Sequence, residues 1–142
     1  MATIQQLLKE KGYDLLSVGP DDTVLDAIEK MAANDVGALV VLRGTDLVGI
    51  FTERHYARNV FLEGRSSPKT KVGEVMSTRV VCAVPEQTVE ECMAVMTDKA
   101  VRHLPVLQEN RIVGIISIGD LVKSKIADQK FVIEQLERYI SS

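Results

Sequence analysis

The chain contains two copies of one pattern, and this duplication limits its possible folds more than any other feature of the sequence. A shift of 65 positions brings Thr23 onto Thr88 and, without a gap, the run Val48-Gly49-Ile50 onto Val113-Gly114-Ile115. Most of the remaining pairs between these points keep their polarity. A repeat of this kind indicates tandem structural units that stack on each other to bury a core. We therefore expect two pseudo-symmetric halves.

Each copy is predicted to form a helix, a hairpin and a second helix. A threonine followed three residues later by an acid marks the first helix start, at Thr23 and at Thr88. Apolar residues then recur at helical spacing. Two apolar runs separated by turn-forming residues predict the hairpin, at 38–42 with 47–51 and at 104–107 with 111–116. The second helices open at Thr52 and Ser117, and a short extended segment precedes each unit.

The predicted fold class is mixed α/β (α+β). We expect each repeat to form a small three-stranded sheet with helices on one face, and the two halves to pack sheet to sheet. Gly49 and Gly114 should lie in strands beside the cleft, where a side chain would crowd a close backbone approach. The predicted divisions are an N-terminal helix, the first repeat, a linker, the second repeat and a C-terminal helix, at 1–11, 12–66, 67–76, 77–127 and 128–142.

Composition excludes several protein classes. The chain carries 17 Lys and Arg against 20 Asp and Glu, a net charge of −3 that argues against nucleic-acid binding through phosphate neutralisation. No apolar run approaches the ~20 residues needed to cross a bilayer, so no membrane association is expected. The N-terminus lacks the features of a signal peptide. Cys82 and Cys92 form no metal-binding or redox motif, which predicts a cytoplasmic protein with reduced thiols and no metal site.

A search for catalytic motifs predicts that the chain is not an enzyme. It contains no glycine-rich dinucleotide fingerprint, P-loop, zinc-protease motif or nucleophile elbow. His55 and His103 lie at non-equivalent places in the two copies, and neither is next to a Ser, Cys or Thr in the pattern of an activated nucleophile. We therefore assign no catalytic residue and no catalytic cofactor.

The junction between the hairpin and the second helix admits two interpretations. In the first, Thr52 and Ser117 are helix caps and Asp120 is the acid of a capping box. In the second, the hydroxyl and the free N–H groups of the helix start bind an anion, and the carboxylate of Asp120 grips a ribose diol. The residue types alone leave both interpretations open.

The repeat and this junction together resemble the CBS domain, whose tandem pair is called a Bateman module. The resemblance spans about residues 12–125. It rests on four stretches of the second copy: Val84-Pro85-Glu86-Gln87-Thr88-Val89, Met93 with Met96, Arg102-His103-Leu104-Pro105-Val106, and Gly114-Ile115-Ile116-Ser117-Ile118-Gly119-Asp120. In the first copy, Phe51-Thr52-Glu53-Arg54-His55-Tyr56-Ala57-Arg58 is similar to a stand-alone bacterial subgroup of CBS-pair proteins.

The resemblance implies binding of an adenine nucleotide (AMP, ADP, ATP or NAD(H)) in clefts between the repeats. In the second site it assigns phosphate and ribose to Ser117 and Asp120, and further phosphate contacts to Arg102 and His103. The adenine would lie among Val80, Val101 and Leu104, with Thr78 alongside. The first site departs from the family pattern, because His55 replaces the ribose-binding acid. Its candidate residues are Thr52, Arg54 and His55.

Two functions follow as hypotheses. The first is a regulatory, non-catalytic nucleotide sensor in signal transduction, which acts on an unidentified protein through ligand-dependent conformation or partner binding. The alternative is a dimeric scaffold that binds no ligand. Under both hypotheses we expect a homodimer, because Ile126, Ile133, Leu136 and Ile140 form an apolar stripe on the predicted C-terminal helix that a second subunit would cover.

Overall fold

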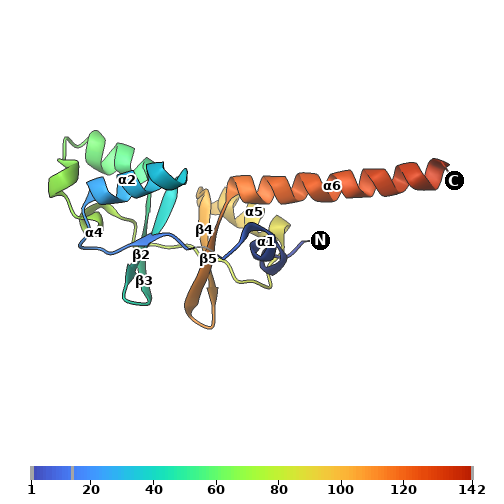
Figure 1. The fold of residues 1–142 in the computed structure, drawn as a ribbon, viewed down its shortest axis with the longest axis horizontal. Helices are drawn as coiled ribbons and strands as arrows, with labels where there is room; N and C mark the ends of the chain where they lie inside the picture. Colours follow the sequence, from blue (N-terminus) through green and yellow to red (C-terminus); the bar gives the residue numbers. More distant parts are fainter. Residues whose placement is uncertain (1, 14, 142) are drawn as a thin grey trace. The chain divides into compact units, whose positions relative to one another are not determined.

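The computed structural model describes residues 2–13 and 15–141 and confirms the mixed α/β class (Figure 1). The chain divides into two compact units. The repeat-1 unit consists of Leu15–Val80 and Glu109–Ile112. The repeat-2 unit consists of Met1–Asp14, Val81–Gln108 and Val113–Ser142. Each unit has a hydrophobic core of its own.

The repeat-1 unit contains the predicted three-stranded sheet, in the order β1-β2-β3. Strand β1 runs parallel to β2, with Ser17 opposite Val40, and β2 runs antiparallel to β3. Helix α2 starts at the predicted cap, Thr23, whose side chain accepts a hydrogen bond from the N–H of Asp26. The elements of this unit are β1 Ser17–Val18, α2 Val24–Asn34, β2 Ala38–Arg43, β3 Asp46–Thr52, α3 Glu53–Tyr56, the π-helix η1 Ala57–Phe61, the 3-10 helix η2 Ser67–Lys69 and α4 Val72–Val75.

The repeat-2 unit contains a two-stranded sheet, so the prediction of three strands in this half was wrong. The expected first strand is reduced to one parallel bridge between Ala83 and Val106. Pairing ends there because the N–H of Val84 donates to the Gln87 side chain at 2.9 Å, and Pro85 has no N–H to offer. The elements of this unit are α1 Ile4–Lys11, α5 Val89–Lys99, β4 His103–Gln108, β5 Arg111–Ser117 and α6 Ile118–Ser141.

Helix α6 replaces two predicted helices. We expected one helix to open at Ser117 and a separate one to cover 128–142, but α6 runs through 24 residues without a break. The stretch contains no proline or other helix-breaking signal that would divide it. None of the helices in the described part of the chain is both long enough and apolar enough to span a membrane.

Each repeat's core is completed by the segment that precedes the other repeat. Helix α1 precedes repeat 1, yet Ile4 and Leu8 are buried in the repeat-2 core beside α5. Helix α4 precedes repeat 2, yet Val72 and Val75 are buried in the repeat-1 core beside α2. Helix α1 therefore belongs to the repeat-2 unit and α4 to the repeat-1 unit, although each directly precedes the other repeat in sequence.

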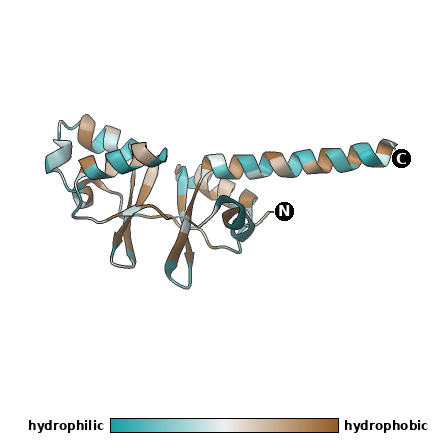
Figure 2. Ribbon diagram, viewed as in Figure 1, coloured by the Kyte–Doolittle hydropathy of each residue, from teal (hydrophilic) through white to brown (hydrophobic). Residues whose placement is uncertain are grey.

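Matching backbone hydrogen bonds fasten the two exchanged segments. The N–H of Val89 donates to the carbonyl of Ala2 at 3.0 Å, and the N–H of Val24 donates to the carbonyl of Thr70 at 2.8 Å. The two donors are the first residues of α5 and α2, which the repeat aligns. The predicted linker 67–76 is therefore not an extended connection, because η2 and α4 fill much of it and α4 packs in the repeat-1 core. Figure 2 shows apolar residues concentrated in the strands of both hairpins.

Both predicted crowded glycines lie in strands, but they face the exchanged segments. A methyl group at Gly49 in β3 would lie 2.5 Å from Met76 Sδ and 2.9 Å from the Ser77 carbonyl oxygen. Ser77 exchanges two 3.0 Å backbone hydrogen bonds with Ile50, so it has little freedom to retreat. A methyl group at Gly114 would meet only the end of the Leu8 side chain, at 2.9 Å.

We predict that Gly49→Ala lowers the free energy of unfolding by about 1–3 kcal/mol, because the added methyl group overpacks a site walled by backbone. Gly114→Ala is the matched control and should cost less, since the end of Leu8 can rotate aside. Urea denaturation of the two variants beside the wild type measures both effects. Equal losses would contradict the proposed role of the Ser77 backbone.

Candidate functional site

At the start of α6, Ser117 and Asp120 form a helix cap and can still accept hydrogen bonds from a ligand. The N–H of Ser117 donates to Asp120 Oδ2 at 2.8 Å, and the N–H of Asp120 donates to Ser117 Oγ at 3.1 Å. This reciprocal pair is a capping box. The N–H of Ser117 and the ammonium of Lys11 both donate to Oδ2, and a carboxylate can accept about four hydrogen bonds, so acceptor capacity is left. Capping therefore does not exhaust what Asp120 can bind.

Lys11 is a member of this site that the sequence analysis missed. Its ammonium lies 2.6 Å from Asp120 Oδ2 and donates to the Ile115 carbonyl at 2.8 Å. The Lys11 side chain comes from the last residue of α1, which the exchange of segments brings into the repeat-2 unit. Because 109 residues separate Lys11 from Asp120, no local pattern could have paired them.

The electrostatics of the junction favour an ionised Asp120 beside a neutral His103. Burial raises the pKa of Asp120, but hydrogen bonds from Lys11 and Ser117 outweigh it and hold the pKa below 3.8. Burial lowers the pKa of His103 below 6.5, and the positive charge of Lys11 lowers it further. At neutral pH the site therefore presents a carboxylate paired with an ammonium, next to an uncharged imidazole.

The structure brings together five of the eight residues predicted for the second site. The Arg102 carbonyl accepts a hydrogen bond from the N–H of Ile118 at 2.9 Å, which fixes Arg102 and His103 at the start of α6. Val101 is half-buried just before them. We call the charged and polar set at this helix start the junction cluster; it comprises Lys11, Arg102, His103, Ser117 and Asp120.

Four predicted residues lie outside the junction cluster: Val101, which directly precedes it, and Thr78, Val80 and Leu104. Leu104 is fully buried in the repeat-2 core, and its assignment to an adenine contact stays a prediction from the resemblance. Its apolar side chain points inward because it occupies a core-facing position of β4. Thr78 is exposed and Val80 is half-buried at the end of the repeat-1 unit. Their assignment to the adenine stays a prediction from the resemblance.

The first candidate site repeats the capping geometry with a histidine in place of the acid. The N–H of Thr52 donates to His55 Nδ1 at 3.1 Å, and the N–H of His55 donates to Thr52 Oγ1 at 3.2 Å. The Phe51 and His55 rings lie 6.4 Å apart. Arg54 is exposed on α3. This arrangement satisfies the helix start but supplies no carboxylate for a ribose.

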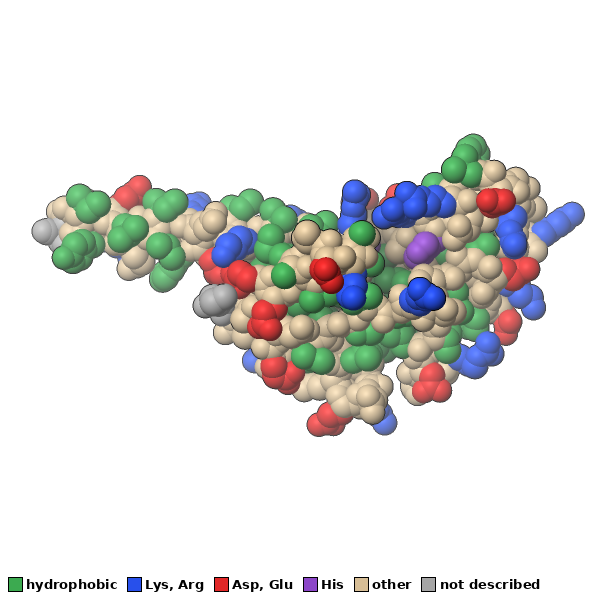
Figure 3. Space-filling view, turned by 180° about the vertical axis from the view of Figure 1, so that it is seen from behind, with side chains coloured by type: hydrophobic (Ala, Val, Ile, Leu, Met, Phe, Trp, Pro, Cys, Tyr) green, Lys and Arg blue, Asp and Glu red, His purple; other side chains and the backbone are tan. Residues whose placement is uncertain are grey.

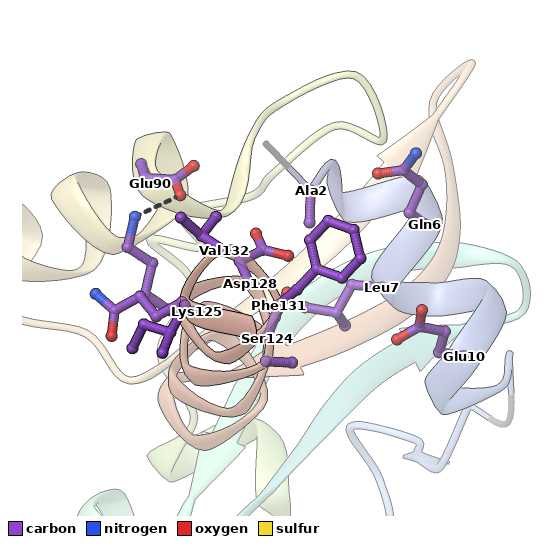
Figure 4. A pocket seen from close by; sticks show the side chains of 13 residues that line it. Ala2, Gln6, Leu7, Glu10, Glu90, Ser124, Lys125, Asp128, Phe131 and Val132 are labelled. Atoms are coloured by element: carbon purple, nitrogen blue, oxygen red, sulfur yellow. Dashed lines mark hydrogen bonds and ion pairs between the residues drawn. The ribbon is translucent and has the colours of Figure 1, made fainter. Parts of the chain in front are cut away.

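A groove of about 970 Å³ lies elsewhere in the repeat-2 unit, between α1, α5 and α6 (Figure 4). Its walls include Leu7, Glu10 and Phe131, and Lys125 forms a 2.9 Å ion pair with Glu90 at one edge. None of the predicted nucleotide-binding residues lines it. Among the residues that the structure describes, no group of His, Cys, Asp and Glu side chains could hold a metal ion.

The state of His55 predicts a pH dependence of stability. Burial, followed by the charge of Arg54, lowers the pKa of His55 below its ordinary value of 6.5. The unfolded chain therefore binds more protons than the folded chain as the pH falls below 6.5, and stability falls with it. Protonation of Nδ1 would also remove the acceptor of the Thr52 cap.

We expect the free energy of unfolding to fall between pH 7.5 and pH 5.5, by less than about 1 kcal/mol per histidine because solvent partly screens these rings. Gln at position 55 can cap Thr52 without titrating, so His55→Gln should flatten part of the dependence. Urea denaturation across this pH range tests it. A wild-type stability that rises toward pH 5.5 would contradict the assigned histidine states.

Comparison with known proteins assigns the chain to a family. The CBS domain model matches residues 9–61 and 72–126. The mitochondrial CBS domain-containing protein CBSX3 of Arabidopsis thaliana is 38% identical, over 97% of this chain and 71% of its own length.

Two solved structures extend the comparison. A protein with CBS domains from Burkholderia ambifaria, described as a signal-transduction protein, is 50% identical with a TM-score of 0.86, over 90% of this chain and 96% of its own. The hexameric CBS-CP12 protein of bloom-forming cyanobacteria is 26% identical with a TM-score of 0.76, over 84% of this chain and 66% of its own. The two family matches cover the two repeats in turn, and the chain belongs to the CBS domain family as a tandem pair.

Proposed function

We propose that the protein is a non-catalytic regulator that binds an adenine nucleotide, AMP or a related ADP, ATP or NAD(H), and changes its conformation or its affinity for a regulated protein. The junction cluster is the observation that carries the proposal. It combines free acceptor capacity on a carboxylate with cationic groups in a chain of the CBS family. The Burkholderia ambifaria protein, described as a signal-transduction protein, supports a regulatory role over an enzymatic one.

In this proposal Asp120 binds the ribose and Ser117, Arg102 and His103 bind phosphate. A ribose diol can donate to Oδ1 of Asp120 while Oδ2 keeps its present partners. Lys11 reduces the repulsion between that carboxylate and an incoming phosphate, because it neutralises the carboxylate at 2.6 Å. Val101 offers apolar surface beside them.

The alternative function is a dimeric scaffold that binds no ligand. One specific observation favours it: the capping box and the Lys11 ion pair already give Asp120 a complete structural role. The two functions differ in whether the wild type binds a nucleotide, and the role of Asp120 differs in whether its loss affects ligand affinity or only stability.

We predict that Asp120→Ala weakens AMP binding at least tenfold, because it removes charge-assisted hydrogen bonds to the ribose. The control is Glu91→Ala, which removes the acid of the matching capping box at Thr88 on α5. It should cost about 1 kcal/mol of stability and leave affinity unchanged. Calorimetric titration with AMP, alongside melting curves, measures both. Unchanged AMP affinity in Asp120→Ala would overturn the assignment of Asp120 to the ribose, whereas no AMP binding by the wild type would favour the scaffold.

We further propose that the protein acts in the cytoplasm as a homodimer. Burial raises the pKa of Cys92 to about 11, so this buried thiol stays protonated, as suits a reducing compartment. The hexameric CBS-CP12 structure is a precedent for assembly in related folds. The exposed apolar side chains of α6 supply a surface for self-association; they are Val122, Ile126, Phe131, Val132, Ile133, Leu136, Tyr139 and Ile140.

We expect the wild-type chain to sediment at twice its 15.7 kDa mass at micromolar concentration. Burial of the apolar face of α6 drives this association. Sedimentation velocity over a concentration series measures it. A 15.7 kDa particle at every concentration up to about 100 μM would contradict the homodimer.

A further inference from the structure

Helix α6 carries an exposed seam with the spacing of a coiled coil. The seam residues are spaced alternately four and three positions apart, as are the core a and d positions of a coiled coil. They are residues 122, 126, 129, 133, 136 and 140. Five of the six are Val, Ile or Leu, and only Gln129 is polar. All six are exposed, with side chains between 39% and 81% accessible where they are apolar.

The seam extends along the part of α6 that runs beyond the rest of its unit. The helix has 24 residues, about 36 Å in length, and every residue from 129 to 141 is exposed. Figure 3 shows hydrophobic side chains spaced along this extension, interleaved with charged ones. Contacts within the described chain leave most of this stripe exposed to water, and an apolar stripe of this kind is suited to packing against a partner helix.

We propose that the partner is α6 of a second copy, and that the two helices pair antiparallel with residues whose numbers sum to 262 facing each other. This inference deepens the proposed homodimer. The register faces Val122 with Ile140, Ile126 with Leu136, and Gln129 with Ile133. Each Gln129 is thus packed against an isoleucine near the middle of the pair, and all other layers are apolar.

The charges beside the seam select this orientation. In an antiparallel pair like flanking positions face each other, so Lys123 faces Glu137 of the second copy, and the symmetry repeats this ion pair. The one contact between like charges brings Lys130 of one copy opposite Lys130 of the other. In a parallel pair Lys125, which is already paired with Glu90, would face Lys130, and no ion pair would form between the two helices. The antiparallel pair therefore gains two ion pairs against one repulsion, whereas the parallel pair gains none.

A groove lies beside the base of α6, where the end of the second helix would pass. The register carries the C-terminal end of the second copy past residues 122–126, beside the groove between α1, α5 and α6. The walls of this groove include the apolar side chains of Leu7, Phe131 and Val132. Lys125 keeps its ion pair with Glu90 there and does not need a partner across the seam.

A charge exchange on the full chain tests the orientation. Sedimentation velocity at low salt would compare the wild type with Lys123→Glu, Glu137→Lys and the double variant. Each single change replaces two attractions by two repulsions and should raise the dimer dissociation constant about tenfold. The double variant should recover wild-type affinity, because its ion pairs are restored with reversed sign. Glu134→Lys makes the same charge change outside the seam and is the matched control.

The outcomes separate this inference from the proposed function. A dimer that the single variants do not weaken would overturn the α6 pairing and leave the homodimer in place on another surface. Single variants that weaken the dimer without rescue in the double variant would overturn the antiparallel register. A monomeric wild type would overturn the homodimer and the pairing together. AMP titration of the same variants reports on nucleotide binding independently, and circular dichroism confirms that each variant is folded.

Discussion

Neither repeat of this protein can build its hydrophobic core from its own residues alone. The apolar residues of α5 and β4 are covered by α1, and those of α2 are covered by α4, each from the segment ahead of the other repeat. This exchange is the constraint on which the remaining structure depends. A chain cut at the boundary between the repeats would remove Ile4 and Leu8 from the repeat-2 core, and Val72 and Val75 from the repeat-1 core. The hydrophobic cost of that loss makes each core depend on sequence from outside its own repeat.

The candidate site is a consequence of the same exchange. The junction of β5 and α6 supplies Ser117 and Asp120, and the start of β4 supplies Arg102 and His103. Only the docking of α1 adds Lys11, at 2.6 Å from the carboxylate. Without that ammonium an anionic ligand would meet a partly buried negative charge. The segment that completes the core thus also sets the charge of the site.

Several features could be predicted from local pattern because their causes are local. Helix starts at Thr23 and Thr88 depend on a hydroxyl and an N–H three residues away, and hairpins depend on alternating runs separated by turns. The residue-by-residue assignment of the site was less secure. Ser117 and Asp120 are where the motif predicted them, but Leu104 faces the core. Burial of a strand residue depends on which face is covered, and the covering helix lies far away in sequence.

The sequence by itself determined the duplication, the order of elements, the caps and the family, because each depends on residue types at fixed short spacing. The tertiary structure alone decided which repeat each preceding segment completes, that the second sheet keeps only two strands, and that Lys11 meets Asp120. It also decided that the apolar stripe of α6 stays exposed as one unbroken helix. These outcomes depend on packing between segments that are as much as 109 residues apart. Because hydrophobic burial is non-directional, such packing produces no regular residue spacing from which it could be predicted.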